Sequence, residues 1–309
     1  MIKKKILFIY NPQAGKGKIK KILSNIIVLL NKNYEVVIYS TKFKQDAEAI
    51  VKECLMSQKY EYVVCSGGDG TLHEVINGIM SCCYRPKIGY IPSGTMNDYA
   101  YSLKVPRNML KAARLVLDEN LFSCDIGLMN DRYFAYNVSF GLFTDAAYQT
   151  SQSLKNTLGR LAYFVEGIKG LSNIKAYHLE LVFEDQVISE DFIYGMVANS
   201  YSVGGFRGIT GENVLLNDGE FEGIFIKMPR NILDLQNIIK DLLRGKYNSG
   251  LVLALPIKNV CIISEESIPW CIDGEFGGEM QTVRIKNCRE AITIAAALGA
   301  KEYGEINLR

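Results

Sequence analysis

The stretch Ser66-Gly67-Gly68-Asp69-Gly70-Thr71 decides how the first part of this sequence folds. It follows the apolar run Tyr62–Cys65, which predicts a strand, and it leads into Thr71–Met80, whose spacing predicts a helix. Glycines permit backbone angles that are closed to other residues and let backbone N–H groups approach a ligand closely. Because the start of the following helix presents free N–H groups and favours an anion, the loop is predicted to bind phosphate.

Asp69 is the unexpected residue of this loop, because a carboxylate repels phosphate unless a cation lies between them. Magnesium removes that conflict, since it binds carboxylates and bridges nucleotide phosphates. The alternative interpretation is an ordinary glycine turn in which Asp69 is the N-cap of the helix. A single Gly-Gly-x-Gly stretch would favour the turn, so the phosphate interpretation depends on the neighbouring loops.

Two further polar loops follow predicted strands. Residues Asn11–Lys18 come after Ile6–Tyr10, and Pro92–Asp98 come after Lys87–Ile91. The first of these loops has neither the spacing of a Walker A loop nor that of a G-x-G-x-x-G loop. Ligands of parallel sheets bind beyond the carboxyl ends of the strands, so three such loops would line one crevice.

Strands and helices alternate through the first third of the chain. A second strand is predicted at Glu35–Ser40, and helical spacing is found at Ile19–Leu30 and Gln45–Ser57. This β-α-β-α order predicts an α/β domain in which helices cover both faces of a parallel sheet.

The pattern changes after about Asp125, where apolar and polar residues begin to alternate. The alternating segments are Tyr177–Phe183, Phe192–Asn199, Glu222–Lys227, Asn259–Ser264 and Thr282–Lys286. They predict antiparallel strands with one buried face, interrupted by helices at Leu154–Leu171 and Ile232–Leu243. We therefore predict a nucleotide-binding α/β domain over residues 1–125 and a mainly β domain over 126–291.

Length and composition limit the class of protein. The 309 residues exceed one ordinary core and fit two domains, and 48% hydrophobic residues exclude a disordered chain. A net charge of +2 argues against a dedicated nucleic-acid binder, so no nucleic-acid partner is expected. The apolar run Ile6–Tyr10 is too short for a signal core or a membrane span. The eight cysteines contain no C-x-x-C pair, which indicates free thiols in a reducing cytoplasm.

Several motifs in order along the chain resemble those of diacylglycerol kinases, sphingosine kinases and their bacterial lipid kinase relatives. They are the Asn-Pro-x-x-Gly start of Asn11–Lys18, the loop Gly67–Thr71, the segment Pro92–Asp98 and Asp273-Gly274-Glu275, which is similar to the family's catalytic segment. Leu215–Glu220 resembles its structural metal loop. The soluble bacterial diacylglycerol kinase branch is the most similar.

This resemblance implies a fold. It consists of an α/β domain like that of NAD kinase and diacylglycerol kinase, followed by a β-sandwich domain that takes the lipid. The active site would lie in the cleft between the two domains. The end of the chain, residues 292–309, would return to the first domain.

The resemblance also implies roles for individual residues. ATP would contact Asn11, Gly15, Gly67, Gly68, Gly70, Thr71 and Thr95, with Thr41 beside the adenosine. Asp69 would help to hold the catalytic magnesium. Glu275 is favoured as the base that takes the lipid hydroxyl proton and Asp273 as part of the magnesium network, although the two roles could be exchanged. Asp218 would bind a structural magnesium together with the carbonyl groups of Leu215 and Glu220.

Some positions leave alternatives open. His73 stands where the family often has asparagine, and it would either donate to the nucleotide or lie on the helix surface. Taken alone, Asp273-Gly274 and Asn217–Gly219 are ordinary turns. Phe140–Ala147 and the apolar stripe of Leu158–Leu171 would contact acyl chains or form core.

The predicted function is that of an ATP- and magnesium-dependent lipid kinase, a transferase that converts diacylglycerol to phosphatidic acid. Such an enzyme would be cytoplasmic and peripherally associated with the membrane, and analogy adds a homodimer. Three alternatives remain: a kinase for phosphatidylglycerol, a sphingoid base or a polyprenol; an NAD kinase-like enzyme, which shares the Gly-Gly-Asp-Gly loop; and a non-catalytic lipid or nucleotide sensor.

Overall fold

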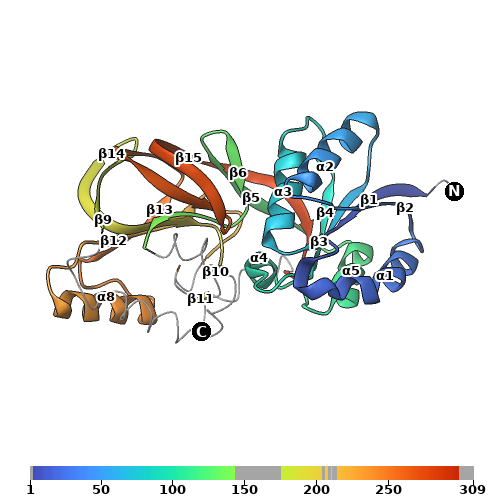
Figure 1. The fold of residues 1–309 in the computed structure, drawn as a ribbon, viewed down its shortest axis with the longest axis horizontal. Coiled ribbons are helices and arrows are strands. Elements are labelled where there is room, and N and C mark those ends of the chain that lie inside the picture. Colours follow the sequence, from blue (N-terminus) through green and yellow to red (C-terminus); the bar gives the residue numbers. More distant parts are fainter. Residues whose placement is uncertain (1–2, 143–174, 204–205, 208–209, 211–213, 299–309) are drawn as a thin grey trace.

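The computed structural model describes residues 3–142, 175–203, 206–207, 210 and 214–298 (Figure 1). The predicted helix Leu154–Leu171, with its apolar stripe, lies outside these residues. So do residues 143–147 of the segment that was expected to contact acyl chains.

Four parallel strands form the first part of the fold, in the order β2-β1-β3-β4. They are β1 (Lys4–Tyr10), β2 (Tyr34–Ser40), β3 (Tyr62–Gly67) and β4 (Lys87–Pro92). β3 is buried along its whole length, as expected for a parallel strand that is covered on both faces. The parallel sheet predicted from the sequence is therefore confirmed.

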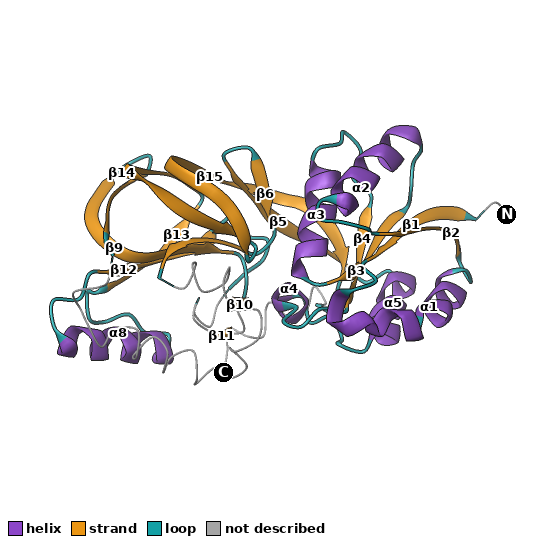
Figure 2. Ribbon diagram, in the orientation of Figure 1, coloured by secondary structure: helices purple, strands orange, loops and turns teal. Residues whose placement is uncertain are grey.

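Helices lie on both faces of these strands (Figures 1 and 2). One face carries α2 (Asp46–Ser57) and α3 (Asp69–Met80), and the other carries α1 (Leu23–Leu30) and α5 (Met109–Asp118). Two short helical segments lie in the connections, the 3-10 segment η1 (Ala14–Lys21) and α4 (Asp98–Ser102).

The remaining described chain is mainly antiparallel. Its strands are β5 (Leu121–Met129), β6 (Arg132–Phe134), β7 (Asn137–Gly141), β8 (Tyr177–Val182), β9 (Val187–Ala198), β10 (Ser202–Val203), β11 (Phe206–Arg207), β12 (Phe221–Lys227), β13 (Val252–Ile257), β14 (Asn259–Ile272) and β15 (Glu275–Ala295). Helix α8 (Ile232–Arg244) covers the end of this region, close to the predicted Ile232–Leu243 (Figure 2).

One continuous sheet joins the two regions. The long strand β15 pairs with β14 and β5 in antiparallel fashion, and its residue Ile294 pairs in parallel with Ile88 of β4. The path therefore runs without interruption from β13 to β2. Alternation within single segments could not predict this, because it shows which face of a strand is buried but not which strand is its neighbour.

Three apolar clusters fill the described part of the molecule. The first packs between the parallel strands and their helices, the second inside the curved antiparallel strands, and the third under α8. In the second cluster Trp270 packs on Phe140, with ring centroids 5.0 Å apart. All eight cysteines are free thiols, as expected. Among the described residues, no helix combines the length and the apolar character needed to span a bilayer.

Asp125 is a fully buried carboxylate at the centre of β5. It accepts hydrogen bonds from the backbone N–H of Gly219 at 2.7 Å and of Glu290 at 2.7 Å, and from the side chain of Asn287 at 3.1 Å. Its own N–H donates to the carbonyl of Leu216. Asp125 therefore ties β5 to the loop before β12 and to a bulge in β15.

Replacing this carboxylate should destabilise the fold. In an Asp125→Asn variant one oxygen becomes an NH2 group that faces N–H donors, so buried polar groups lose their acceptor. We expect the free energy of unfolding, measured with urea, to fall by roughly 2–4 kcal/mol. Asp131→Asn, at an exposed position just beyond β5, is the matched control and should change stability by less than about 0.5 kcal/mol. Equal stability of the two variants would contradict the role given to Asp125.

Candidate active site

The loop between β3 and α3 is tightly packed. Gly68 is the residue before α3 and has φ −89°, and neither Gly67 nor Gly70 has a positive φ, so the expectation of unusual backbone angles is wrong for these glycines. A methyl group on Gly67 would lie 2.4 Å from the side chain of Thr71, and one on Gly70 would lie 2.8 Å from an oxygen of Glu275. Glycine is needed here because other groups approach closely.

The loop after β1 contacts this glycine loop. The backbone N–H of Asn11 donates to the carbonyl of Ser66 at 2.8 Å, and its side-chain amide donates to the hydroxyl of Thr71 at 3.4 Å. Thr41 follows β2, and its N–H donates to the carbonyl of Tyr10. The ends of β1, β2 and β3 therefore carry predicted site residues at one edge of the sheet.

The loop after β4 also contacts the glycine loop and the loop after β1. The carbonyl of Gly67 accepts hydrogen bonds from the N–H groups of Ser93 at 2.8 Å and Gly94 at 3.2 Å. Gly15 has φ +54°, and a methyl group there would lie 1.9 Å from the carbonyl oxygen of Ser93, so only glycine fits. Thr95 is exposed beside Gly94. All predicted nucleotide residues thus lie at, or within a few residues of, the carboxyl ends of neighbouring parallel strands.

Asp69 begins α3 but does not cap it. Its carboxylate accepts hydrogen bonds from the N–H groups of Asp98 at 3.2 Å and Tyr99 at 3.4 Å, at the start of α4, so the N-cap alternative is wrong. Burial, together with the nearby carboxylates of Asp98 and Asp273, raises the pKa of Asp69 to about 7. A buried acid beside two others is an environment in which a cation would be stabilised.

Asp273 and Gly274 form the two-residue turn between β14 and β15. Their φ angles of +48° and +82° are those of a type I′ turn, so the hairpin interpretation is confirmed. The Asp273 carboxylate also accepts three backbone N–H groups, from Ala135 at 2.7 Å, Tyr136 at 3.0 Å and Asn137 at 3.0 Å. The turn is therefore fixed against the chain that leads into β7.

His73 connects this turn to α3. Its Nδ1 lies 2.8 Å from Asp273 Oδ2, both side chains are buried, and the expectation of a helix-surface histidine is wrong. Its Nε2 faces the Asn77 side chain at 3.4 Å, and Asn77 also donates to the carbonyl of Tyr133 at 2.9 Å. The hairpin is thus held on the same helix that begins at Asp69.

Glu275 follows the turn and lies against Gly70 at the start of α3. Its Oε2 forms an ion pair with the Lys44 ammonium at 2.9 Å, and its side chain remains 30% exposed. A partly exposed carboxylate next to a phosphate-type loop can accept a proton from a bound hydroxyl group. Sequence reasoning missed Lys44, because nothing in the spacing of the loop after β2 indicates that it reaches a residue so far along the chain.

Asp98 is a second residue to which sequence reasoning gave no role. It is buried, its Oδ1 accepts a hydrogen bond from the Ser202 hydroxyl at 2.6 Å, and its charge acts on Asp69. The sequence did contain a signal for Asp98, because it is the last residue of the segment Pro92–Asp98, which resembles a motif of the lipid kinase family. The loop geometry was needed to place it beside Asp69.

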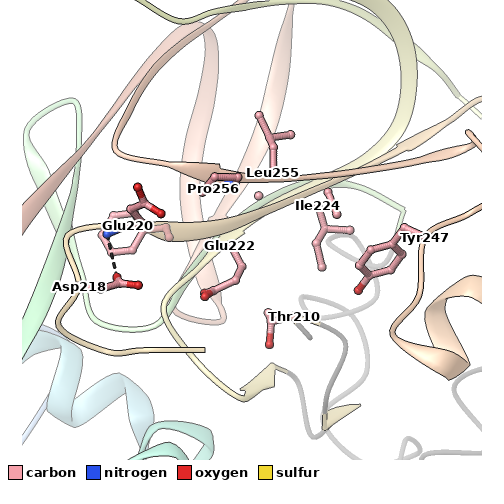
Figure 3. Close-up of a pocket in the computed structure, with 11 residues that line it drawn as sticks. Thr210, Asp218, Glu220, Glu222, Ile224, Tyr247, Leu255 and Pro256 are labelled. Carbon is pink, nitrogen blue, oxygen red and sulfur yellow. Dashed lines mark hydrogen bonds between the residues drawn. The ribbon is translucent and has the colours of Figure 1, made fainter. Parts of the chain in front are cut away.

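The predicted structural metal residues form a separate group. Asp218 Oδ1 accepts the N–H of Glu220 at 3.0 Å within a turn, and the same loop carries Leu215 and is bonded to Asp125. Asp218 and Glu220 line a pocket of about 320 Å³ together with Glu222 and Tyr247 (Figure 3). Burial raises the pKa of Asp218 and raises that of Glu222 to about 8, and Glu222 Oε2 has no hydrogen-bond partner among the described residues.

Comparison with known proteins identifies the family. The model of the diacylglycerol kinase catalytic domain matches residues 5–129. The chain is 34% identical over 281 residues to a diacylglycerol kinase of Staphylococcus carnosus, covering 90% of this chain and 91% of the relative. It is 32% identical to a diacylglycerol kinase of Staphylococcus haemolyticus, covering 88% and 82% of the two chains.

Solved structures of diacylglycerol kinases are also similar to this chain. The crystal structure of a diacylglycerol kinase from Bacillus anthracis superposes with a TM-score of 0.74 at 25% identity, covering 95% of this chain and 97% of that chain. Because the catalytic-domain model matches it, and because it is 34% identical to a diacylglycerol kinase over nine-tenths of its length, the chain belongs to the diacylglycerol kinase family.

Proposed function

We propose that this protein is an ATP- and magnesium-dependent kinase that transfers a phosphoryl group to the hydroxyl of diacylglycerol and forms phosphatidic acid. One observation carries the proposal: the carboxylate of Glu275, from the antiparallel region, lies against Gly70 in the glycine loop of the parallel region. A proton acceptor therefore lies beside the loop that would hold the transferred phosphate.

We propose that the site lies between two domains, residues 1–125 and 126–291, with the chain from 292 onward returning to the first. The return is supported by the pairing of Ile294 with Ile88 and by the burial of Ile292 and Leu298 in the first apolar cluster. The hairpin of Asp273 belongs to the second domain and α3 to the first, so residues from both would act on one nucleotide.

ATP would be bound by the loops at the strand ends. The N–H groups around Gly67, Gly68 and Gly70 would face its phosphates, helped by the start of α3. Residues of the neighbouring loops would contact the rest of the nucleotide: Asn11, Gly15, Thr41, Thr71 and Thr95. The contacts among these loops support this assignment, because they hold the loops in place before the ligand binds.

The residues around Asp69 fit a divalent cation. Within the described part of the chain Asp69 accepts two long hydrogen bonds, at 3.2 and 3.4 Å, and it lies near the carboxylates of Asp98 and Asp273. No described residues form a group of three or more His, Cys, Asp or Glu side chains that could hold a metal ion by themselves. Asp69 would therefore hold magnesium together with the bound nucleotide, and the ion would supply neutralisation of the phosphate charge.

Glu275 is the proposed base. Lys44 orients its carboxylate, and its partial exposure lets an acceptor hydroxyl approach. Asp273 is less suited to this role, because its side chain is fully buried and its oxygens accept three backbone N–H groups in addition to facing His73. We therefore assign Asp273 the task of positioning the hairpin, and through it Glu275, in place of the magnesium contact predicted from the sequence.

A second magnesium at Asp218, with the carbonyl groups of Leu215 and Glu220, remains part of the proposal. The unpartnered Oε2 of Glu222 supports a cation here, because Glu222 lines the same pocket as Asp218 and Glu220, but these three carboxylates would not hold the ion without the carbonyl groups. Such an ion would have a structural role, because the loop is bonded to Asp125 of β5. We also propose that the enzyme works from the cytoplasm at the membrane surface, as a homodimer.

The activity itself is testable. Purified protein with ATP, magnesium and diacylglycerol in detergent mixed micelles should form phosphatidic acid, measured by transfer of labelled phosphate. Asp69→Asn and Glu275→Gln should each lower kcat by at least about a hundredfold, since they remove a metal ligand and a base. Glu266→Gln, which removes an exposed carboxylate bonded to Lys175, should leave the rate unchanged.

Other acceptors belong in the same experiment. Phosphatidylglycerol, a sphingoid base, a polyprenol and NAD should each be phosphorylated more slowly than diacylglycerol. Faster transfer to any of them would replace the proposed substrate. Full activity of both the Asp69 and Glu275 variants would show that the site lies elsewhere.

The raised pKa of Asp69 gives a separate prediction that does not depend on activity. The pKa is about 7 in the folded protein and about 3.9 in an unfolded chain, so between these values the folded state binds more protons. Without metal and nucleotide, this group therefore lowers the free energy of unfolding as pH rises through that range.

An Asp69→Asn variant lacks this titration. Between pH 5 and pH 8 in EDTA, its free energy of unfolding should rise relative to that of wild type by roughly 2–3 kcal/mol, measured by urea titration. Magnesium should stabilise wild type, but not the variant, at the higher pH. Asp131→Asn is the control and should behave as wild type does. If the free energy of unfolding had the same pH dependence in wild type and Asp69→Asn, the Asp69 carboxylate would not be buried and weakly bonded as described above.

A further inference from the structure

Helix α8 is held firmly on the antiparallel region. The side chain of Asn231 accepts the N–H of Asp234 at 2.9 Å, and the Asp234 carboxylate accepts the N–H of Arg230 at 2.9 Å, so the helix start is capped in both directions. Leu235 and Ile238 are buried in the third apolar cluster against β9, β12 and β13. One face of the helix is therefore fixed.

The acidic side chains of α8 also form hydrogen bonds within the protein. Asp234 caps the helix start, and Asp241 is buried and accepts the N–H of Ser249 at 3.0 Å. The exposed charged residues between positions 230 and 250 are all basic: Arg230, Lys240, Arg244 and Lys246. This stretch thus presents positive charge to solvent with no exposed acidic side chain among its described residues.

The outward face combines that charge with exposed aliphatic side chains. At about 100° per residue, Leu233, Lys240 and Arg244 lie on one side of the helix, opposite Leu235 and Ile238, and Ile232 lies at the edge of that side, about 60° from Leu235. Ile232 is 66% exposed and Leu233 is 68% exposed. Two exposed aliphatic residues at one end of a helix, with two cations roughly 10–18 Å further along its axis, can contact acyl chains and lipid phosphates at the same time.

We propose that the outward face of α8 docks the protein on an anionic lipid bilayer, an inference that rests on the proposed lipid kinase function. Ile232 and Leu233 would enter the boundary between headgroups and acyl chains, and Lys240 and Arg244 would contact lipid phosphates. The uniform positive charge favours a bilayer over a second copy of the chain, since two such faces would repel each other.

The placement of α8 agrees with this role. In Figure 1 the helix lies along the lower edge of the antiparallel region, on the same side of the molecule as α4. Helix α4 begins at Asp98, whose N–H bonds to Asp69. A bilayer against α8 would therefore face the side of the molecule that carries an element of the candidate active site.

The test uses the full chain and two double variants. Ile232→Ser with Leu233→Ser removes the exposed aliphatic groups, and Lys240→Glu with Arg244→Glu reverses the charge. Matched controls are Val28→Ser with Met56→Ser, which are exposed on α1 and α2, and Lys111→Glu with Arg114→Glu, which are exposed on α5. Circular dichroism and thermal unfolding establish that every variant is folded.

Binding is measured by co-sedimentation with vesicles of phosphatidylcholine containing about 30% phosphatidylglycerol. Each α8 variant should bind at least tenfold more weakly than wild type, because each basic side chain contributes roughly fivefold near an anionic surface and each buried aliphatic side chain at least as much. The controls should bind within about twofold of wild type, and salt should weaken wild-type binding. If both α8 variants bind as wild type does, or if wild type does not bind these vesicles, the proposal is overturned.

Two further measurements separate this proposal from others. If the α8 face joined two copies, sedimentation equilibrium would show wild type as a dimer and an α8 variant as a monomer. That result, together with unchanged vesicle binding, would overturn the membrane assignment. In detergent mixed micelles, the α8 variants should phosphorylate diacylglycerol at the wild-type rate and lose rate only on vesicles. Failure of wild type in micelles would refute the proposed function, whereas vesicle binding would still decide the role of α8.

Discussion

The buried carboxylate of Asp273 is the constraint on which the candidate site depends. Burying a charge in a protein is costly unless hydrogen bonds compensate it, and here three backbone N–H groups and His73 surround one carboxylate. These donors come from the chain before β7 and from α3, so the hairpin has one position in which the charge is satisfied. That position brings Glu275, two residues on, against the start of α3.

The same tightness explains the glycines of the site. Gly67 leaves room for Thr71, Gly70 for Glu275, and Gly15 for the carbonyl of Ser93. A side chain at any of these positions would separate two of the loops or displace Glu275. Rigid loops are useful to an enzyme that transfers phosphoryl groups, because catalysis of this kind consists mainly of positioning and charge stabilisation.

Much of this arrangement could be predicted from the sequence, and the limits have physical causes. Periodicity predicted the parallel strands and α8, because burial repeats locally along the chain. The continuous sheet through β5 and β15 could not be predicted in this way, since the identity of a neighbouring strand is not a local property. For the same reason the sequence motifs marked Asp69 and Glu275 but missed Lys44, whose partner is distant along the chain.

Counting donors distinguishes the buried carboxylates in a way that residue type cannot. Asp125 and Asp273 each accept several short hydrogen bonds, which compensate their burial and leave little capacity for a ligand. Asp69 accepts two long ones, and one oxygen of Glu222 accepts none from the described residues. An incompletely bonded carboxylate lowers the stability of the folded protein, and a bound cation would reverse that loss. The incomplete bonding at Asp69 and Glu222 therefore supports the proposal that cations bind at these two places, where binding would restore stability to the fold.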